Sequence, residues 1–132
     1  MLREVFTTHS PYKKRARTLA IMWTLLIFIL CFIPGREFPD VNIPLADKWA
    51  HFVLFGIFSF LWLCARPARK LLPLTLVFLA GVTLGWIVEE LQGLLTSLGR
   101  SKSIGDIYAD AIGSLFGVLV FAIISVAVNK RE

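Results

Sequence analysis

Four long, almost uncharged runs divide this sequence, and short polar segments separate them. The runs are TLAIMWTLLIFILCFI (18–33), WAHFVLFGIFSFLWLCA (49–65), LLPLTLVFLAGVTLGWIV (71–88) and AIGSLFGVLVFAIISVAV (111–128). A helix that crosses the hydrocarbon core of a bilayer needs about 20 apolar residues, with a usual range of about 17–25. Each run reaches that length when its flanking residues are added. The pattern therefore predicts an all-α protein, an integral membrane four-helix bundle.

Composition and charge agree with this prediction. Hydrophobic residues make up 57% of the chain and charged residues 17%, whereas an average globular domain has about 25% charged residues. Ten of the 14 Lys and Arg residues precede the first run, follow the fourth or lie between the second and third. The positive-inside rule then predicts cytoplasmic N and C termini and a cytoplasmic 66–70 turn. Basic and aromatic residues do not alternate in a soluble segment, so we do not predict a nucleic-acid partner.

We expect one membrane domain with short tails. Residues 1–17 form a basic cytoplasmic tail, poorly ordered or lying on the membrane surface, residues 18–128 form the four-helix domain, and residues 129–132 form a second cytoplasmic tail. The first run is longer than the apolar core of a cleaved signal peptide and lacks a small-x-small site, which favours an uncleaved anchor helix. Cys31 and Cys64 fall at opposite membrane depths, so we expect no disulfide between them.

The unusual polar residues all fall at one membrane level, the outer one. Three lie in the first turns of the second span, two near the end of the third, and the rest in the following loop and the start of the fourth. They are Asp47, Lys48, His51, Glu89, Gln92, Arg100, Ser103, Asp106 and Asp110. Ionisable residues within spans usually face a partner or a cavity, so this set is predicted to bind a ligand.

Helical phase gives these residues a common face. Asp47 and His51 are spaced i, i+4, and Glu89 continues the line of Gly81 and Gly85. On the fourth span, Gly113 and Gly117 continue the line of Asp106 and Asp110 in the same way. Small-xxx-small spacing allows close helix packing in membranes, so we expect the glycine faces of spans three and four to pack together.

Other polar residues have simpler predicted roles. Asp47 is expected to cap the second span, and Ser103 with Asp106 has capping-box spacing for the fourth. Glu90 lies about 100° around the helix from Glu89 and is expected to face the headgroup region. Lys48 and Lys102 are interpreted as side chains that extend toward the membrane surface.

Several kinds of chemistry are open to this set. His51, Glu89 and Asp106 are candidate catalytic residues, because a histidine beside a carboxylate can act in general acid–base catalysis. Carboxylates and imidazole also suit divalent metals, but tight ligand spacing such as HExxH is absent from the sequence, so no metal is predicted. Ser101 or Ser103 as a nucleophile lacks a GxSxG elbow, and Arg100 suits a bidentate phosphate or carboxylate contact.

Two segments, DKWAHFVLFG and EELQGLLTSLGRSKSIGDIYADAIGSLFG, resemble the VanZ-like family. That family is typified by D-K-x-x-H, then E-x-x-Q, then R-x-x-S-x-x-D-x-x-x-N-x-x-G-x-x-x-G. The resemblance covers about residues 20–128, with Asp110 where the family usually has Asn. It implies a multi-pass protein of the bacterial cytoplasmic (inner) membrane, concerned with the cell envelope. The family's namesake is associated with resistance to the glycopeptide teicoplanin.

Our leading hypothesis is an outward-facing polar pocket that binds or protects a cell-envelope component, or that confers glycopeptide tolerance. The expected partners are the lipid bilayer and a lipid-linked envelope precursor or a lipoglycopeptide. One alternative is a small intramembrane enzyme acting on a lipid-linked envelope substrate, and another is a structural or assembly subunit. The sequence specifies no cofactor.

Overall fold

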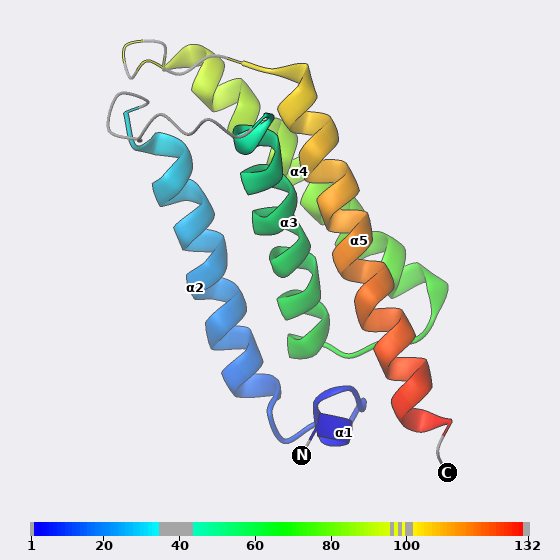
Figure 1. Ribbon diagram of the computed structural model, residues 1–132. Coiled ribbons are helices and arrows are strands. Elements are labelled where there is room, and N and C mark those ends of the chain that lie inside the picture. Colours follow the sequence, from blue (N-terminus) through cyan, green and yellow to red (C-terminus); the bar gives the residue numbers. More distant parts are fainter. Residues whose placement is uncertain (1, 35–43, 96, 98, 100–101, 131–132) are drawn as a thin grey trace.

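The computed structural model describes residues 2–34, 44–95, 97, 99 and 102–130. Within this part the helices are α1 (Leu2–Val5), α2 (Lys13–Phe32), α3 (Ala46–Ala65), α4 (Leu71–Leu94) and α5 (Ile104–Asn129). The four long helices run alternately up and down (Figure 1). Each is long and apolar enough to cross a membrane. The predicted all-α bundle with four membrane-spanning helices is therefore confirmed.

The alternating directions give the bundle two distinct ends. One end, here called the loop end, carries the α2–α3 and α4–α5 connections, and the other, the terminus end, carries both chain termini and the α3–α4 turn (Figure 1). Cys31 lies near the loop end and Cys64 near the terminus end; both are buried, and no disulfide joins them. This separation agrees with the depths expected from the sequence.

Residues 2–17 contain helix α1 and the first residues of α2. Helix α2 already begins at Lys13, because Lys and Arg are good helix formers and extend the apolar helix toward its N terminus. Before it, Phe6 is buried, and its ring centroid lies 5.3 Å from that of Phe121 and 6.1 Å from that of Phe60. The expected poorly ordered or surface segment thus includes an aromatic anchor that fixes α1 at the terminus end.

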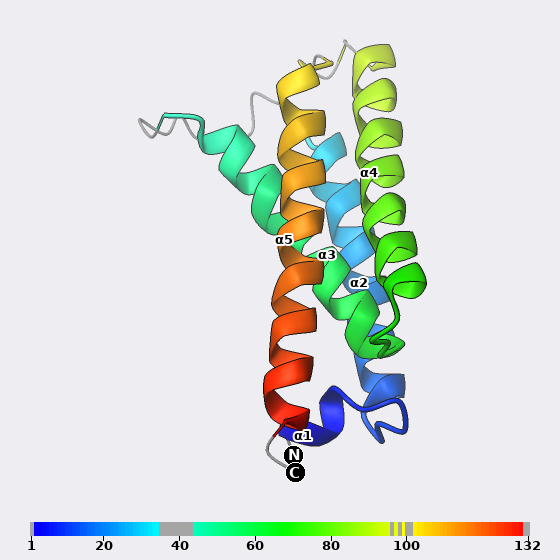
Figure 2. The same ribbon diagram turned by 90° about the vertical axis from the view of Figure 1, so that its right-hand side faces the viewer.

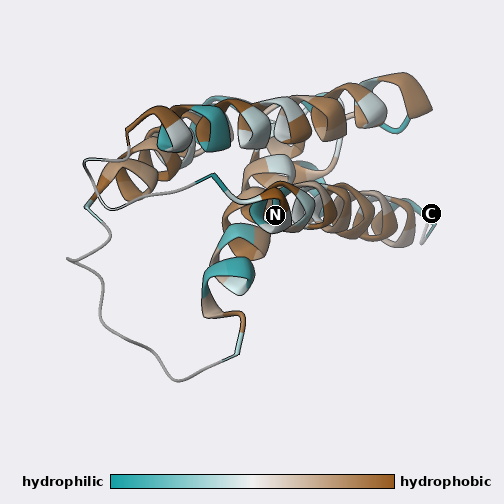
Figure 3. Ribbon diagram, turned by 90° about the horizontal axis from the view of Figure 1, so that it is seen from above, coloured by the Kyte–Doolittle hydropathy of each residue, from teal (hydrophilic) through white to brown (hydrophobic). Residues whose placement is uncertain are grey.

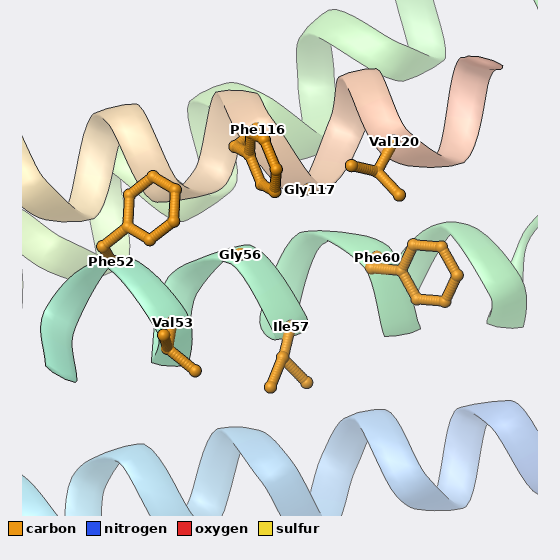
Figure 4. A pocket seen from close by; sticks show the side chains of 8 residues that line it. All are labelled: Phe52, Val53, Gly56, Ile57, Phe60, Phe116, Gly117 and Val120. Carbon is orange, nitrogen blue, oxygen red and sulfur yellow. The ribbon is translucent and has the colours of Figure 1, made fainter. Parts of the chain in front are cut away.

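The closest helix crossing joins α3 and α5 through glycines. A Cβ atom on Gly113 would overlap the backbone of Phe52, and one on Gly117 would overlap the backbone of Gly56. A shallow apolar groove of about 320 Å³ runs beside this crossing, lined by Phe116 and other apolar residues of α3 and α5 (Figure 4). Here small residues permit backbone contact in the absence of a hydrophobic driving force.

This crossing corrects the expected packing of the glycine faces. On α4, Gly81 faces Ser114 of α5, and a Cβ atom on Gly85 would lie 2.7 Å from the Cβ atom of Asp110. Gly113 and Gly117 of α5 therefore pack on α3, whereas Gly81 and Gly85 of α4 pack on α5. The reason is geometric. The small residues of α5 cover an arc of about 100° around the helix, and α3 and α4 each pack on part of it. Helix α3 is also inclined to the other long helices (Figure 2).

The distribution of apolar and polar side chains suits a lipid environment. Large apolar side chains such as Leu79, Phe116 and Ile123 are exposed, whereas Glu89 and Asp110 are fully buried. Seen from above, apolar residues dominate the long helices (Figure 3). Extensive exposed apolar surface marks a membrane or partner interface, so we treat the four long helices as membrane-spanning.

Candidate functional site

The predicted polar residues meet at the loop end, between α3, α4 and α5. His51 and Glu89 lie about 8 Å inside the loop ends of α3 and α4. Asp106 and Asp110 lie in the first two turns of α5. We define the polar cluster as the six residues that these three helices and the N-cap of α5 bring together, Lys48, His51, Glu89, Ser103, Asp106 and Asp110.

A histidine–aspartate pair forms the centre of the polar cluster. The Nδ1 atom of His51 lies 2.7 Å from Oδ1 of Asp110, and its Nε2 atom lies 3.6 Å from Oδ2 of Asp106. The His51 ring also stacks on Phe55, with 5° between the ring planes. When the Nδ1–H group donates a hydrogen bond to Asp110, the Nε2 atom is the basic nitrogen and is directed toward Asp106.

Lys48 belongs to the polar cluster and does not simply extend to the membrane surface, as the sequence suggested. Its Nζ atom lies 2.6 Å from Oδ1 of Asp106, 2.9 Å from Oδ2 of Asp47 and 3.4 Å from Oγ of Ser103. The carboxylate of Asp106, just inside the membrane surface, holds the ammonium group there. Lys48 is thereby fixed between α3 and the start of α5.

Asp47 lies at the exposed rim and does not cap α3. The N-cap is Leu45, in a left-handed conformation with φ of 58° and without a side-chain cap bond. The side chain of Asp47 is 63% exposed and pairs with Lys48. The expected cap is therefore wrong, because α3 begins at Ala46, two residues earlier than a cap at Asp47 requires, and places Asp47 inside its first turn.

Glu89 and Ser103 form a cap that joins two helices. The Ser103 hydroxyl accepts a hydrogen bond from the Asp106 backbone N–H at 3.4 Å, as the capping-box spacing predicted. In a complete capping box, the acid at the third helical position would bind the N-cap N–H. Here that N–H of Ser103 donates instead to Oε2 of Glu89 at 2.9 Å. Because Glu89 accepts this hydrogen bond, the carboxylate of Asp106 remains available to Lys48 and His51.

Two carboxylate oxygens in the polar cluster lack hydrogen-bond partners among the residues that the structure describes. They are Oε1 of Glu89 and Oδ2 of Asp110, and both residues are 0% exposed. Among the described residues around the site, four carboxyl side chains accompany the one ammonium group of Lys48: Asp47 and Asp106 pair with it, Asp110 pairs with His51, and Glu89 lies beside His51 and Asp106. Buried charges of one sign are costly unless a partner compensates them, so the site favours a positively charged group.

Besides Asp47, two predicted ligand-binding residues, Gln92 and Arg100, are not placed in the polar cluster. The side-chain amide of Gln92 donates to the backbone carbonyl of Cys31 at 2.9 Å and so ties α4 to the end of α2. The carbonyls of the last helical turn lack partners within their own helix, which explains this contact. Arg100 and Ser101 lie outside the residues that the structure describes.

Glu90 faces away from the polar cluster, as its helical phase predicted. Its carboxylate accepts from Nε1 of Trp86 at 2.9 Å and pairs with Lys102. Trp86 is exposed at this level, as are Trp49 and Tyr108. Exposed Trp and Tyr side chains are typical of membrane–water interfaces. We therefore expect the lipid headgroups at this level of the bundle.

The sequence interpretation missed a serine pair below the polar cluster. Oγ of Ser59 lies 2.6 Å from Oγ of Ser114, and the Ser114 hydroxyl also reaches the Phe78 carbonyl at 3.3 Å. Ser114 follows Asp110 at i+4, and Ser59 follows His51 at i+8. The same spacing that linked the glycines to the carboxylates would have found both serines.

The three candidate catalytic residues converge in space. Ligand atoms from His51, Glu89 and Asp106, one from each, lie within 4.8 Å of one another, and all three residues are buried. A fixed imidazole among carboxylates can move a proton or hold a cation. Each residue comes from a different helix, and their depth and helical phase in the sequence had placed them at one level.

Comparisons with known proteins place this architecture in a family. Searches of the curated proteins and of the solved structures gave no match to the chain. The model of the family described as VanZ/LLP1 matches residues 4–125, a span that contains all six residues of the polar cluster and all four long helices up to the last turn of α5. The chain therefore belongs to the VanZ-like family.

Proposed function

We propose that the polar cluster binds the headgroup of an amphiphilic cell-envelope component, and that by this binding the protein protects the envelope or confers tolerance to a lipid-bearing glycopeptide. The component is a lipid-linked envelope precursor or the lipoglycopeptide itself. The protein acts in the bacterial cytoplasmic membrane, with the loop end outward. The observation that carries the proposal is the convergence of Lys48, His51, Glu89 and Asp106 from three elements.

The position of the polar cluster supports binding of a headgroup. It lies between exposed Trp49, Trp86 and Tyr108, where an amphiphile places its polar part. Apolar helix surface continues below it, so the tail of the same molecule can remain in the bilayer. A purely structural network would not need two buried carboxylate oxygens without partners.

The charge of the polar cluster restricts the ligand. Within the polar cluster the carboxylates of Glu89, Asp106 and Asp110 outnumber the ammonium group of Lys48, so an anionic headgroup alone would be repelled. The bound group must bring positive charge, either as an ammonium group of its own or through a cation bound with it. Amino groups and phosphate–cation pairs both meet this requirement.

A second candidate function is intramembrane acid–base catalysis on a lipid-linked substrate. The observation that favours it is the 2.7 Å contact between His51 Nδ1 and Asp110. A buried carboxylate that orients a histidine leaves the opposite nitrogen ready to accept a proton. In this role His51 would be the general base, and Asp110 would be a positioning residue.

Membrane abundance and antibiotic susceptibility measured side by side test the proposed function. The variants Glu89→Gln and Lys48→Gln remove one charge each but keep a polar side chain, and in Glu89→Gln the new amide oxygen can still accept from Ser103. We expect normal membrane levels with loss of any tolerance to a lipid-bearing glycopeptide. Glu90→Gln is the matched control, because Glu90 is adjacent but points away from the polar cluster.

Two results would contradict headgroup binding. Loss of abundance in both variants, with the control at wild-type level, would show that the polar cluster is a structural network. Normal abundance with unchanged susceptibility would show that it does not act on this class of compound.

A further inference from the structure

We infer that His51, Glu89 and Asp106 bind a divalent transition-metal ion, with Asp110 orienting the histidine. The inference deepens the proposed headgroup site and uses the same polar cluster, but metal binding by the purified protein can be measured without any envelope phenotype. A bound ion would supply the positive charge that the carboxylates require.

The spacing of the ligand atoms fits such an ion. One atom from each of His51, Glu89 and Asp106 lies within 4.8 Å of the other two. Ligands that surround a metal at about 2.0–2.2 Å are about 3–4 Å apart, so small side-chain rotations complete the geometry. Three protein ligands leave a coordination position for an oxygen of the headgroup.

A separate observation points to a cation-binding role for Glu89. Oε1 of Glu89 is buried without a hydrogen-bond partner, although its other oxygen accepts from Ser103. Oδ2 of Asp110 is buried without a partner as well. Carboxylate oxygens in the interior are normally satisfied. A metal ion beside Glu89 would satisfy the first of them and reduce the repulsion acting on the second.

The contacts of His51 match those of a metal ligand. A histidine that binds a metal through one ring nitrogen usually donates from the other nitrogen to a carboxylate or carbonyl group. In this protein Nδ1 lies 2.7 Å from Asp110, and Nε2 faces Asp106. Asp110 thus fixes the tautomer that directs the Nε2 lone pair to the ion.

The mixture of ligands defines the class of metal. Imidazole with two carboxylates suits Zn²⁺, Mn²⁺ or Fe²⁺, whereas Mg²⁺ and Ca²⁺ prefer oxygen ligands alone. Zn²⁺ and Mn²⁺ are the practical probes, and Mg²⁺ is the negative control.

The test uses the full chain, purified in detergent without a polyhistidine tag and treated with a chelator. His9, the other histidine, is exposed, so a His9→Asn background removes its contribution. Calorimetric titration should give one Zn²⁺ or Mn²⁺ per chain and a higher thermal midpoint, while Mg²⁺ gives neither. Affinity should fall at least about tenfold in Glu89→Gln and Asp106→Asn, and by about 10–100-fold in Asp110→Ala, with Asp110→Asn restoring part of the loss. Glu90→Gln should bind like the parent.

Absence of Zn²⁺ and Mn²⁺ binding in the parent protein would overturn the inference. It would also be overturned if Glu89→Gln and Asp106→Asn bound these metals as tightly as the Glu90→Gln control. If these variants fail to fold, metal binding by the parent protein alone tests the inference. Its Co²⁺ complex should show absorption bands stronger than those of the aqueous ion, and a spectrum like that of the aqueous ion would overturn the inference. A parent protein that binds no metal, together with variants that lose the envelope phenotype, would leave headgroup recognition standing without the metal. A parent protein that binds metal, together with an unchanged phenotype in Glu89→Gln and Lys48→Gln, would contradict only the proposed envelope function.

Discussion

At the scale of single residues, Asp110 connects most of the features of the site. It contacts His51 through one oxygen, leaves the other without a hydrogen-bond partner, and packs against the backbone of Gly85. Any side chain at residue 85 would press on it. Asp110 is also the position at which the resemblance to the VanZ-like pattern leads us to expect Asn, and Asn there could still accept a hydrogen bond from the imidazole.

Substitution of Asp110 should therefore separate hydrogen bonding from charge. We expect Asp110→Leu to lower the free energy of unfolding by about 1–3 kcal/mol, because it leaves the buried Nδ1 of His51 without an acceptor. Asp110→Asn keeps an acceptor and should cost less. Unfolding in detergent, followed by circular dichroism, measures both, with Asp47→Asn at the exposed rim as the control.

Equal stability of Asp110→Leu and the parent protein would mean that the histidine–aspartate contact contributes nothing to folding. Such a result would also weaken the assignment of Asp110 as a positioning residue for His51.

Most of the polar cluster could be predicted from residue spacing and depth. His51, Glu89, Asp106 and Asp110 were expected at one level and on facing sides, and the structure brings them together. Lys48 was misinterpreted because its ion pair with Asp106 spans 58 positions in sequence. Gln92 was misplaced because helical phase gives the direction of a side chain but not which neighbouring helix stands there.

At the scale of the helices, the crossing of α3 and α5 depends on small residues. The sequence predicted close packing at Gly113 and Gly117, but not that α3 is the partner. Gly56 carried no signal, because it stands alone among large apolar residues. Hydrophobic periodicity identifies helices, and only their relative inclination decides which faces meet.

Substitution of Gly117 should disrupt this crossing. Gly117→Leu places a bulky side chain against the backbone of Gly56. We expect the free energy of unfolding to fall by on the order of 1–3 kcal/mol or more, measured as a lower thermal midpoint in detergent. Leu119→Ala, on the exposed side of α5, is the matched control and should change little. A Gly117→Leu protein as stable as the parent would show that the two backbones do not approach here.

The N-terminal segment gives a second prediction for an element. Phe6→Ala removes the ring that packs on Phe60 and Phe121, which should release α1 from the bundle. Limited trypsin digestion should then cut faster near Arg3 and Lys13. Leu2→Ala, whose side chain is exposed, is the control. Unchanged cleavage in Phe6→Ala would show that α1 is not held by this ring.

At the scale of the whole molecule, the two ends of the bundle have different chemistry. The loop end holds the acidic polar cluster, whereas Lys13, Arg17 and Arg66 line a groove of about 650 Å³ toward the terminus end. Basic side chains at that level suit the anionic lipids of a cytoplasmic leaflet. The four spans were predictable because bilayer thickness fixes their length, while the membrane orientation still depends on the rule of basic asymmetry.

Placement of the polar cluster at the outer surface underlies every envelope role proposed for it, and cysteine labelling measures this placement directly. In a chain without Cys31 and Cys64, a cysteine in place of Ser97 should react with a membrane-impermeant thiol reagent in intact cells. A cysteine in place of Ala68 should react only after the membrane is permeabilised. The ten-to-four distribution of basic residues between the two sides predicts this result. Labelling at residue 68 but not at residue 97 in intact cells would place the polar cluster on the cytoplasmic side and contradict its role at the outer envelope.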